Sequence, residues 1–371
     1  MALVLTGGGA RAAYQVGLLK FLARRFPELT IPILTGVSAG ALNAVALANH
    51  PGSLVSAVEE LAELWSSLSV EQVFRVDRRS LASHAARFGL RLFSGGSASA
   101  PRFTSLVDTA PLRELVTRVL TREGHALAGI DANVASDRLR AVAITTTCYA
   151  TGRSVTWFQG PEVEPWARPQ RVGIRTQLGV DHVLASAALP LLFPAVRIGG
   201  TWHGDGDVRL AAPLSPALHL GARRILAVST RFAAFEREAA NPTAAYPPPA
   251  QVIGTILNTV FLDMLEQDAL RLVQVNELLL RGGGPLPNGT RQVELFVIRP
   301  SQDPGVLARQ FEPHLPSALR FLTRGLGTRE TDSADSLSFI LFEPRYLRAL
   351  IELGERDAES YAHAIESFVT H

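Results

Sequence analysis

The sequence predicts an α/β fold of three layers, in which a mainly parallel central sheet is covered by helices on both faces. Two units of strand, glycine turn and helix open the chain. Residues 2–5 form a short apolar run closed by glycines and followed by a helix-like stretch over residues 10–26. Residues 31–35 repeat the pattern, with a turn at residues 36–40 and an apolar helix through residue 48. Successive units of this kind are typical of parallel sheets buried on both faces.

Short apolar runs farther along the chain extend the predicted sheet. Strands are expected at residues 139–147, 154–158, 225–228 and 293–298. The α/β core is therefore expected to span residues 1–300. Within it, residues 54–129 have a mostly helical pattern with a Gly/Ser-rich break at 94–97, and we interpret them as a helical insertion or cap. Residues 301–371 are expected to form a helical C-terminal extension packed on the core, with helices over 345–353 and 357–368.

Composition excludes several classes of protein. Of 371 residues, 47% are hydrophobic and 19% are charged, which predicts a folded chain with a sizeable core. The formal net charge is only +2, and no cationic cluster resembles a nucleic-acid-binding surface, so we expect no nucleic-acid partner. Cys148 is the single cysteine, which rules out an intramolecular disulfide and a thiolate metal cluster. A reducing compartment, and hence a cytoplasmic location, is expected.

One long uncharged span could be mistaken for a membrane segment. No Asp, Glu, Lys or Arg occurs between Glu28 and Glu59, a length that could cross a bilayer as a continuous helix. Pro32, several glycines and the pair Pro51-Gly52 interrupt it, however. The N-terminus also lacks the basic region of a signal peptide. We therefore expect a soluble protein.

A candidate nucleophile lies in the second glycine turn. Gly36-x-Ser38-x-Gly40 stands between a predicted strand and a predicted helix, which is the pattern of a nucleophile elbow. Flanking glycines are needed there because the turn is strained and neighbouring elements approach it closely. The adjoining helix N-terminus offers positive partial charge beside the serine hydroxyl. The pattern predicts Ser38 as a catalytic nucleophile.

The first glycine turn allows two interpretations. Consecutive glycines after a strand, Gly7, Gly8 and Gly9, expose backbone N–H groups that suit an anion or the oxyanion of acyl transfer. Gly7-x-Gly9-x-x-Ala12 also fits a dinucleotide-binding fingerprint, so an oxidoreductase remains an alternative. That fingerprint expects an acidic residue at the end of the second strand, whereas Glu28 precedes this strand.

A third feature is Asp205-Gly206, an aspartate beside a glycine that can reach into a cleft at the edge of a sheet. Taken together, the motifs resemble those of the bacterial patatin-like phospholipases. That family has a glycine-rich loop ending in arginine, a G-x-S-x-G elbow, an A-S-x-A-x-P-x-x-F-P segment, and D-G-G or D-G-A. In the same order this chain contains Gly7-Gly8-Gly9-Ala10-Arg11, Gly36-Val37-Ser38-Ala39-Gly40, residues 185–194, and Asp205-Gly206.

The resemblance implies a lipid acyl hydrolase with a patatin-like fold and a Ser38–Asp205 dyad that works through an acyl-enzyme. It implies that the loop of Gly7, Gly8 and Gly9 forms the oxyanion hole, and that Arg11 supports this loop or contacts a phosphate. No metal and no cofactor are expected. The expected partner is a phospholipid or another lipid ester, met by peripheral contact with a membrane. Acyl transfer to an alcohol is the alternative on the same dyad.

The chain departs from the family pattern at two positions. Ala12 replaces the glycine that usually follows the loop arginine, a small change at a helix start. Asp207 stands at the third position of D-G-G and places a second carboxyl two residues from Asp205. Like charges at this spacing can raise a pKa. We expect Asp205 to be the base because it precedes the glycine as in the family.

Histidines provide the remaining alternative, a Ser-Asp-His triad hydrolase. By chain order the triad histidine would be His219, His314 or His363. If His203 and Asp205 both lie on a strand, they share a face of it, and we expect His203 to be structural or to line the rim of the site. A lipid-binding protein that lost activity is the non-enzyme alternative, which the presence of both Ser38 and Asp205 disfavours.

Overall fold

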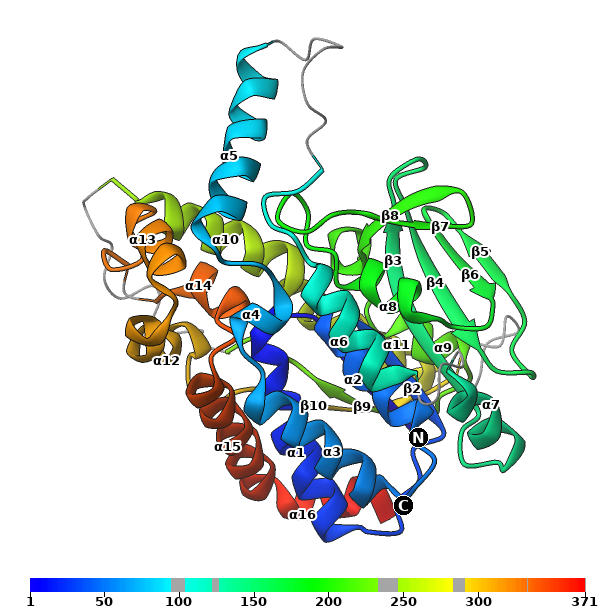
Figure 1. Cartoon of the computed structure of the whole chain (residues 1–371). Helices are drawn as coiled ribbons and strands as arrows, with labels where there is room; N and C mark the ends of the chain where they lie inside the picture. Colours follow the sequence, from blue (N-terminus) through cyan, green and yellow to red (C-terminus); the bar gives the residue numbers. More distant parts are fainter. Residues whose placement is uncertain (95–103, 122–126, 233–245, 283–290, 332, 371) are drawn as a thin grey trace.

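The computed structural model (Figure 1) describes residues 1–94, 104–121, 127–232, 246–282, 291–331 and 333–370. Its strands are β1 (Ala2–Leu5), β2 (Ile33–Val37), β3 (Ala141–Cys148), β4 (Arg153–Gln159), β5 (Trp166–Arg168), β6 (Arg171–Arg175), β7 (Val196–Ile198), β8 (Thr201–Asp205), β9 (Arg224–Val228) and β10 (Glu294–Ile298). They form one sheet in the order β10-β9-β1-β2-β3-β4-β6-β5, with β8 on β3 and β7 on β8. The pairs from β10 to β3 are all parallel, which confirms the mainly parallel central sheet.

The longer helices surround this sheet. They are α1 (Ala13–Arg25), α2 (Ala39–Asn49), α3 (Leu54–Ser67), α5 (Arg78–Phe93), α6 (Ala110–Leu120), α7 (Ala128–Ala135), α10 (Pro249–Phe261), α11 (Asp263–Arg281), α12 (Pro304–Phe311), α13 (Ser317–Gly325), α15 (Pro344–Ser360) and α16 (Ala362–Thr370). Shorter ones are η1 (Gly9–Ala12), α4 (Val70–Val73), α8 (Val180–Ser186), η3 (Gly206–Arg209), α9 (Ser215–His219), η4 (Glu312–His314) and α14 (Asp335–Ile340). Most of the expected break at residues 94–97 lies outside the described residues.

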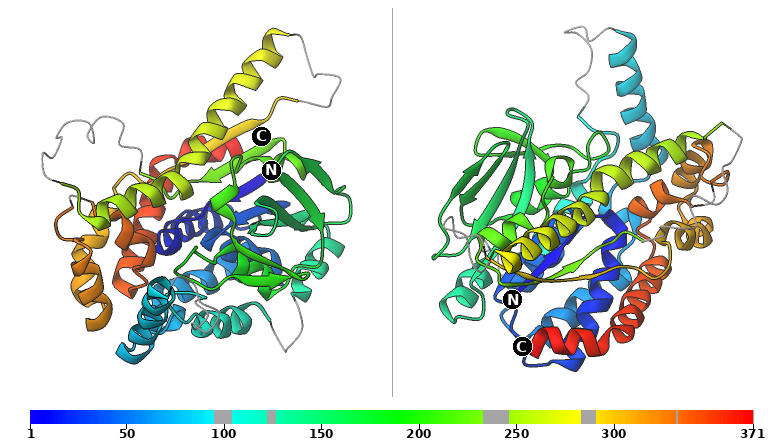
Figure 2. Two further views of the ribbon diagram at one scale, coloured as in Figure 1. Left: turned by 90° about the horizontal axis from the view of Figure 1, so that it is seen from above. Right: turned by 180° about the vertical axis from the view of Figure 1, so that it is seen from behind.

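Alternate side chains along the strands point to opposite faces of the sheet, so the hydrophobic core has two layers. Leu3 and Leu5 of β1 face α1 and α3, whereas Ala2 and Val4 face α9 and α11. Such alternation is the period-two geometry of a strand whose two faces are both buried. Figure 2 (right) brings α11 to the front, on the side of the sheet opposite α3. Helices therefore cover both faces, as the sequence predicts.

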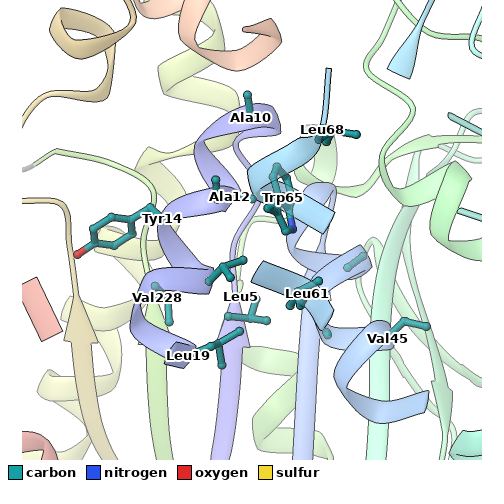
Figure 3. Close-up of a cluster of buried hydrophobic side chains, with 14 of the residues drawn as sticks. Leu5, Ala10, Ala12, Tyr14, Leu19, Val45, Leu61, Trp65, Leu68 and Val228 are labelled. Carbon is teal, nitrogen blue, oxygen red and sulfur yellow. The ribbon is translucent and has the colours of Figure 1, made fainter. Parts of the chain in front are cut away.

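The layer above the sheet is a continuous apolar cluster. Figure 3 shows Leu19 of α1 together with Leu61 and Trp65 of α3, packed over Leu5 and Val228 of the sheet. All five side chains are at most 3% exposed. At about 1.5–3 kcal/mol for each fully buried large apolar side chain, this layer stabilises the strand ends that carry the first two glycine turns.

The C-terminal helices pack on the first helix of the chain. α15 lies along α1, and Gly354 faces the Tyr14 carbonyl so closely that a Cβ on this glycine would collide with it. The Tyr14 hydroxyl donates to Asp357 Oδ2 at 3.0 Å. Gly354 thus lets α15 pack closely on α1 within a continuous helix that extends to Ser360, and the predicted break near residue 355 is wrong. The division of the chain at residue 300 stays a prediction.

Four strands were not predicted, namely β5, β6, β7 and β8. Each is only three to five residues long, and β8 begins with the exposed residues Thr201 and Trp202. Gly199 and Gly200, both with positive φ, turn the chain from β7 into β8. Short strands with exposed residues lack the apolar run on which sequence prediction depends.

The part of the chain that the structure describes contains neither a candidate membrane span nor a candidate metal cluster. No helix there is both long enough and apolar enough to cross a membrane. Over the same residues, no group of three or more His, Cys, Asp or Glu side chains is arranged to hold a metal ion.

Candidate active site

Two strand ends meet along one edge of β3. β2 runs parallel to β3 and pairs with it as far as Val37, which lies opposite Thr145. β8 runs the other way, and its last residue, Asp205, lies opposite Thr146. The other edge of β3 is occupied by β4, so β2 and β8 point toward each other on the same side. This arrangement brings Asp205 next to Ser38, the residue that follows β2.

Ser38 has the strained backbone of a nucleophile elbow. Its φ of 54° and ψ of −130° are values that non-glycine residues rarely adopt. The flanking glycines are required by close contacts: a Cβ on Gly36 would collide with the Gly40 carbonyl, and one on Gly40 would collide with the Leu5 carbonyl. The turn therefore places the Ser38 side chain beyond the end of β2, at the N-terminus of α2.

Three hydrogen bonds hold Ser38 and the carboxyl beside it. The Ser38 hydroxyl donates to Asp205 Oδ2 at 2.7 Å, and the Ser38 N–H donates to Ser186 Oγ at 3.0 Å. The Ser186 hydroxyl in turn donates to the Thr145 carbonyl at 2.7 Å. Sequence reasoning did not single out Ser186, although it lies in the segment of residues 185–194 that carries part of the family resemblance. The structure brings Ser38 and Asp205 together and adds Ser186 as a positioning residue.

The loop of Gly7, Gly8 and Gly9 lies beside this pair. Gly8 and Gly9 have φ values of 139° and 57°, and the Gly7 carbonyl accepts a 2.6 Å hydrogen bond from the Thr230 hydroxyl. Within the described residues, the N–H groups of Gly7 and Gly8 donate to no protein acceptor. These two donors remain available to a bound group. Thr230, which follows β9, was not anticipated, and no sequence motif marks it.

Arg11 is buried away from solvent and is fully engaged in protein contacts. It is 2% exposed, and its Nε donates to Ser338 Oγ at 2.7 Å. Its Nη2 contacts Asp335 Oδ1 at 2.6 Å, and the guanidinium lies 4.6 Å from the Phe339 ring centroid. Arg11 thereby ties η1, directly after the glycine loop, to α14. Of the two roles considered for Arg11, these contacts favour support of the loop over phosphate binding.

Burial raises the pKa values of both carboxyls at the site. The pKa of Asp205 is raised to about 7 by burial, against hydrogen bonds from Ser38 and from the Asp207 N–H that lower it. The pKa of Asp207 is raised well above its ordinary value by burial and by the charge of Asp205. Burial and the same charge also raise the pKa of the neighbouring Tyr149. A carboxylate with a pKa near 7 is well matched to take a proton at neutral pH.

The raised pKa of Asp205 predicts that the free energy of unfolding depends on pH. Between the ordinary aspartate pKa of 3.8 and about 7, folded Asp205 holds a proton that the unfolded chain releases. The stability that the protonated Asp205 contributes to the folded state is therefore lost as the pH rises through about 7. We expect Asp205→Asn to have a higher melting temperature than the wild type at pH 8, and a smaller advantage at pH 5.

Thermal unfolding followed by circular dichroism at both pH values measures this difference. Asp181→Asn is the matched control, because Asp181 forms an exposed surface pair with Arg113 that contributes little to stability. An advantage of Asp205→Asn that shrank from pH 5 to pH 8 would contradict the burial argument.

None of the candidate histidines contacts Ser38 or Asp205 in the described structure. His203 is buried on β8, and its two ring nitrogens lie 3.0 Å from Thr146 Oγ1 and 2.9 Å from Thr201 Oγ1. His219 bonds to the Ser215 carbonyl, and His314 bonds to Arg345. His363 is exposed on α16. Among the described residues, none of these four histidines provides an imidazole partner for Ser38.

The dinucleotide alternative conflicts with the position of Glu28. The C-terminal end of β1 lies opposite Gly36 near the end of β2, so the glycine loop and Ser38 share one edge of the sheet. Glu28 lies in the connection before β2 begins, at the opposite edge. A ribose contact from Glu28 to a dinucleotide on the glycine loop is therefore excluded.

An apolar pocket opens beside the nucleophile. Ser38 and Gly9 are part of its lining, and most of its wall is apolar. Its lining includes Leu42, Leu64, Trp65, Leu112, Leu115, Val116, Leu184 and Phe193. A second pocket of about 380 Å³ is lined by Glu28, His50 and Leu139, at the opposite edge of the sheet. Of these two pockets in the described part of the chain, the first is the smaller, at about 60 Å³, and it is the one whose lining includes Ser38 and a largely apolar wall.

Three solved structures to which the chain has a distant similarity are a human phospholipase, VipD and a type III effector protein. Human GIVD cytosolic phospholipase A2 is 14% identical with a TM-score of 0.46, over 99% of this chain and 59% of that one. VipD from Legionella pneumophila is 12% identical with a TM-score of 0.34, over 94% and 66%. The type III effector protein ExoU is 12% identical with a TM-score of 0.40, over 100% and 53%. This chain thus spans about half to two thirds of their lengths, and similarity this low carries no argument about function.

Sequence comparison is more direct. No curated protein matches the sequence significantly. The family model of the patatin-like phospholipases matches residues 3–218, which is more than half of the chain and includes Ser38 and Asp205. The chain therefore belongs to the patatin-like phospholipase family.

Proposed function

We propose that this protein is a lipid acyl hydrolase in which Ser38 is the nucleophile and Asp205 is the general base. The observation that carries the proposal is the 2.7 Å hydrogen bond from the Ser38 hydroxyl to Asp205 Oδ2, made at a strained elbow. Membership of a phospholipase family supports a lipid ester as substrate. A nucleophile within hydrogen-bond reach of its base is the arrangement that covalent catalysis requires.

Acylation begins with attack of Ser38 Oγ on the ester carbonyl carbon. As the new bond forms, the serine proton passes to Asp205 along the existing hydrogen bond. The carbonyl oxygen becomes an oxyanion, which the free N–H groups of Gly7 and Gly8 stabilise. The protonated Asp205 then gives its proton to the leaving alcohol, and Ser38 remains acylated.

Deacylation repeats these steps with water in place of the serine hydroxyl. Asp205 takes a proton from the attacking water and returns it to Ser38 Oγ as the bond between this oxygen and the acyl carbon breaks, which releases the fatty acid. An alcohol in place of water would make the protein an acyltransferase, the alternative on the same residues. Throughout both steps the burial of Asp205, which is 0% exposed, keeps its basicity high.

The apolar pocket supports a fatty acyl chain as the part of the substrate that is bound. Leu42, Leu115 and Ser38 all line it, so an acyl chain bound there would hold its ester close to the nucleophile. Burying each CH₂ group there contributes about 0.8 kcal/mol. We therefore expect kcat/KM to increase with acyl length until the pocket is filled.

A fluorophosphonate probe with an alkyl chain tests the proposal. The phosphorus is attacked by an activated serine and fluoride leaves, so the wild-type protein should gain one adduct, found by mass spectrometry on the peptide that contains Ser38. Heat-denatured protein is the control and should remain unlabelled. A folded wild type that is neither labelled nor able to hydrolyse p-nitrophenyl esters would overturn the assignment.

A further inference from the structure

Asp207 is a buried carboxyl of the active site that the proposed mechanism does not use. It lies in η3, directly after the base, and is 7% exposed. Its Oδ2 is fully buried and has no hydrogen-bond partner among the described residues. A buried polar atom without a partner costs about 1–3 kcal/mol, so its retention calls for an explanation.

Asp207 Oδ2, the atom without a partner, lies against the loop of Gly7, Gly8 and Gly9. A Cβ built on Gly7 would overlap Asp207 Oδ2 and would lie 2.9 Å from Ser38 Cβ. Asp207 and Ser38 therefore approach Gly7 from the same side. The carboxyl therefore packs against the first glycine of the loop, on the side of Gly7 that Ser38 also faces.

Asp207 does not bond to the base through its carboxyl. One Asp205 oxygen accepts from the Ser38 hydroxyl at 2.7 Å, and the other accepts from the Asp207 backbone N–H at 3.0 Å. Both oxygens of the base are therefore already occupied by other donors. A proton on Asp207 Oδ2 would point to the space beside Gly7 and not to Asp205.

The surroundings of Asp207 favour its neutral form. Helix α10 packs against η3 and has no ionisable side chain. Strands β3 and β4 also contact η3, and their ionisable residues are Cys148 and the exposed Arg153. In η3 itself, Arg209 is bound to the Gly152 carbonyl and to Gln170.

On the base's side, the ionisable groups are Asp205 and His203 of β8 and Tyr149 after β3. Within the described residues, Asp205 is the one charged group that acts on Asp207, and it is a like charge. Two adjacent buried carboxyls cannot both ionise without large cost, so one proton remains on the pair. Asp205 has hydrogen bonds that favour its ionised form, and Asp207 Oδ2 has none.

We propose that Asp207 stays protonated in the working enzyme and donates a hydrogen bond to the substrate carbonyl oxygen as this becomes the oxyanion. The inference rests on the proposed function, because it assumes attack by Ser38. No bond to Asp207 is made or broken: its proton remains on the carboxyl and is shared with the oxyanion only as a hydrogen bond. A neutral carboxylic acid can stabilise an oxyanion in this way when its site is apolar.

Two substitutions distinguish hydrogen-bond donation by Asp207 from the space that its side chain fills. Asp207→Asn keeps the size and a donor but cannot ionise, whereas Asp207→Ala removes the donor. Loss of one oxyanion donor costs about 10² to 10³ in kcat. We expect Asp207→Ala to lower kcat about a hundredfold with little change in KM, and Asp207→Asn to stay within about tenfold of the wild type. Asp181→Asn is the exposed control.

The pH profile supplies a second readout. Ionisation of Asp207 removes the donor, so the wild-type kcat should fall at alkaline pH, and this limb should be missing from Asp207→Asn. Rates are divided by the fraction of Ser38 labelled by the fluorophosphonate probe, so that misfolded molecules are not counted. A limb that persists in Asp207→Asn belongs to another group, such as Tyr149, and overturns the assigned protonation.

The outcomes also separate this inference from the proposed function. An active, labelled wild type with an equally active Asp207→Ala overturns the inference alone. Asp207→Asn as slow as Asp207→Ala also overturns it, because a donor of the same size should rescue the rate. A wild type that is neither labelled nor active overturns the proposed function instead.

Discussion

Ser38→Ala is expected to abolish ester hydrolysis while leaving the fold intact. The substitution removes only the hydroxyl that attacks the ester, and the rate should fall by roughly 10³ to 10⁶. Alanine keeps the Cβ of serine, so the strained backbone at φ 54° is no harder to form. Hydrolysis of a short-chain p-nitrophenyl ester by purified protein measures the effect, with circular dichroism to check folding.

Ser154→Ala is the matched control for this variant. Ser154 lies on β4, and at 1% exposed it is as deeply buried as Ser38, which is 2% exposed. We expect its activity to equal that of the wild type. Normal turnover by Ser38→Ala would eliminate the nucleophile assignment.

Asp205→Asn is expected to lower kcat by about a thousandfold or more. The amide of asparagine has nearly the shape of the carboxylate but cannot accept the serine proton, so the general base is lost. The Ser38 hydroxyl can still donate to the amide oxygen, whereas the hydrogen bond from the Asp207 N–H to the second carboxylate oxygen is lost. Steady-state kinetics on the same ester give kcat and KM separately, and the loss should be confined to kcat.

Histidine variants test the triad alternative against this result. His203, His219, His314 and His363 make no contact with Ser38 or Asp205 in the described structure. Each alanine variant should therefore keep kcat within about tenfold of the wild type, with the largest effect at His203 because it is buried on the same strand as Asp205. A loss above a thousandfold at any one histidine would transfer the base role to that residue. If Asp207→Asn were inactive and Asp205→Asn were active, the role of general base would belong to Asp207.

Local backbone chemistry explains why much of the fold and site could be predicted. An apolar run followed by glycines and a helix can form only a few structures, and both opening units were found as β1 with α1 and β2 with α2. Gly36 and Gly40 are needed because neighbouring backbone lies where a Cβ on either residue would be. The short Gly-x-Ser-x-Gly pattern is enough to indicate this requirement. The strained turn at Ser38 was predictable because the serine and its flanking glycines are neighbours along the chain.

Partners distant in sequence were not predictable in this way. Arg11 contacts Asp335 and Ser338, which lie 324 and 327 residues away, and no motif marks either of them. Thr230 anchors the Gly7 carbonyl across 223 residues. These contacts depend on where α14 and β9 come to lie, and packing of the whole core decides that.

By itself the sequence determined the α/β class, the strained turn at Ser38 and the glycine loop, because each depends on neighbouring residues and their backbone preferences. Only the tertiary structure decided that β2 and β8 converge on β3, which joins Ser38 to Asp205 over 167 residues. It also decided the burial that raises the pKa of Asp205 to about 7. Proximity and desolvation arise from the packed sheet as a whole, and no short stretch of sequence contains them.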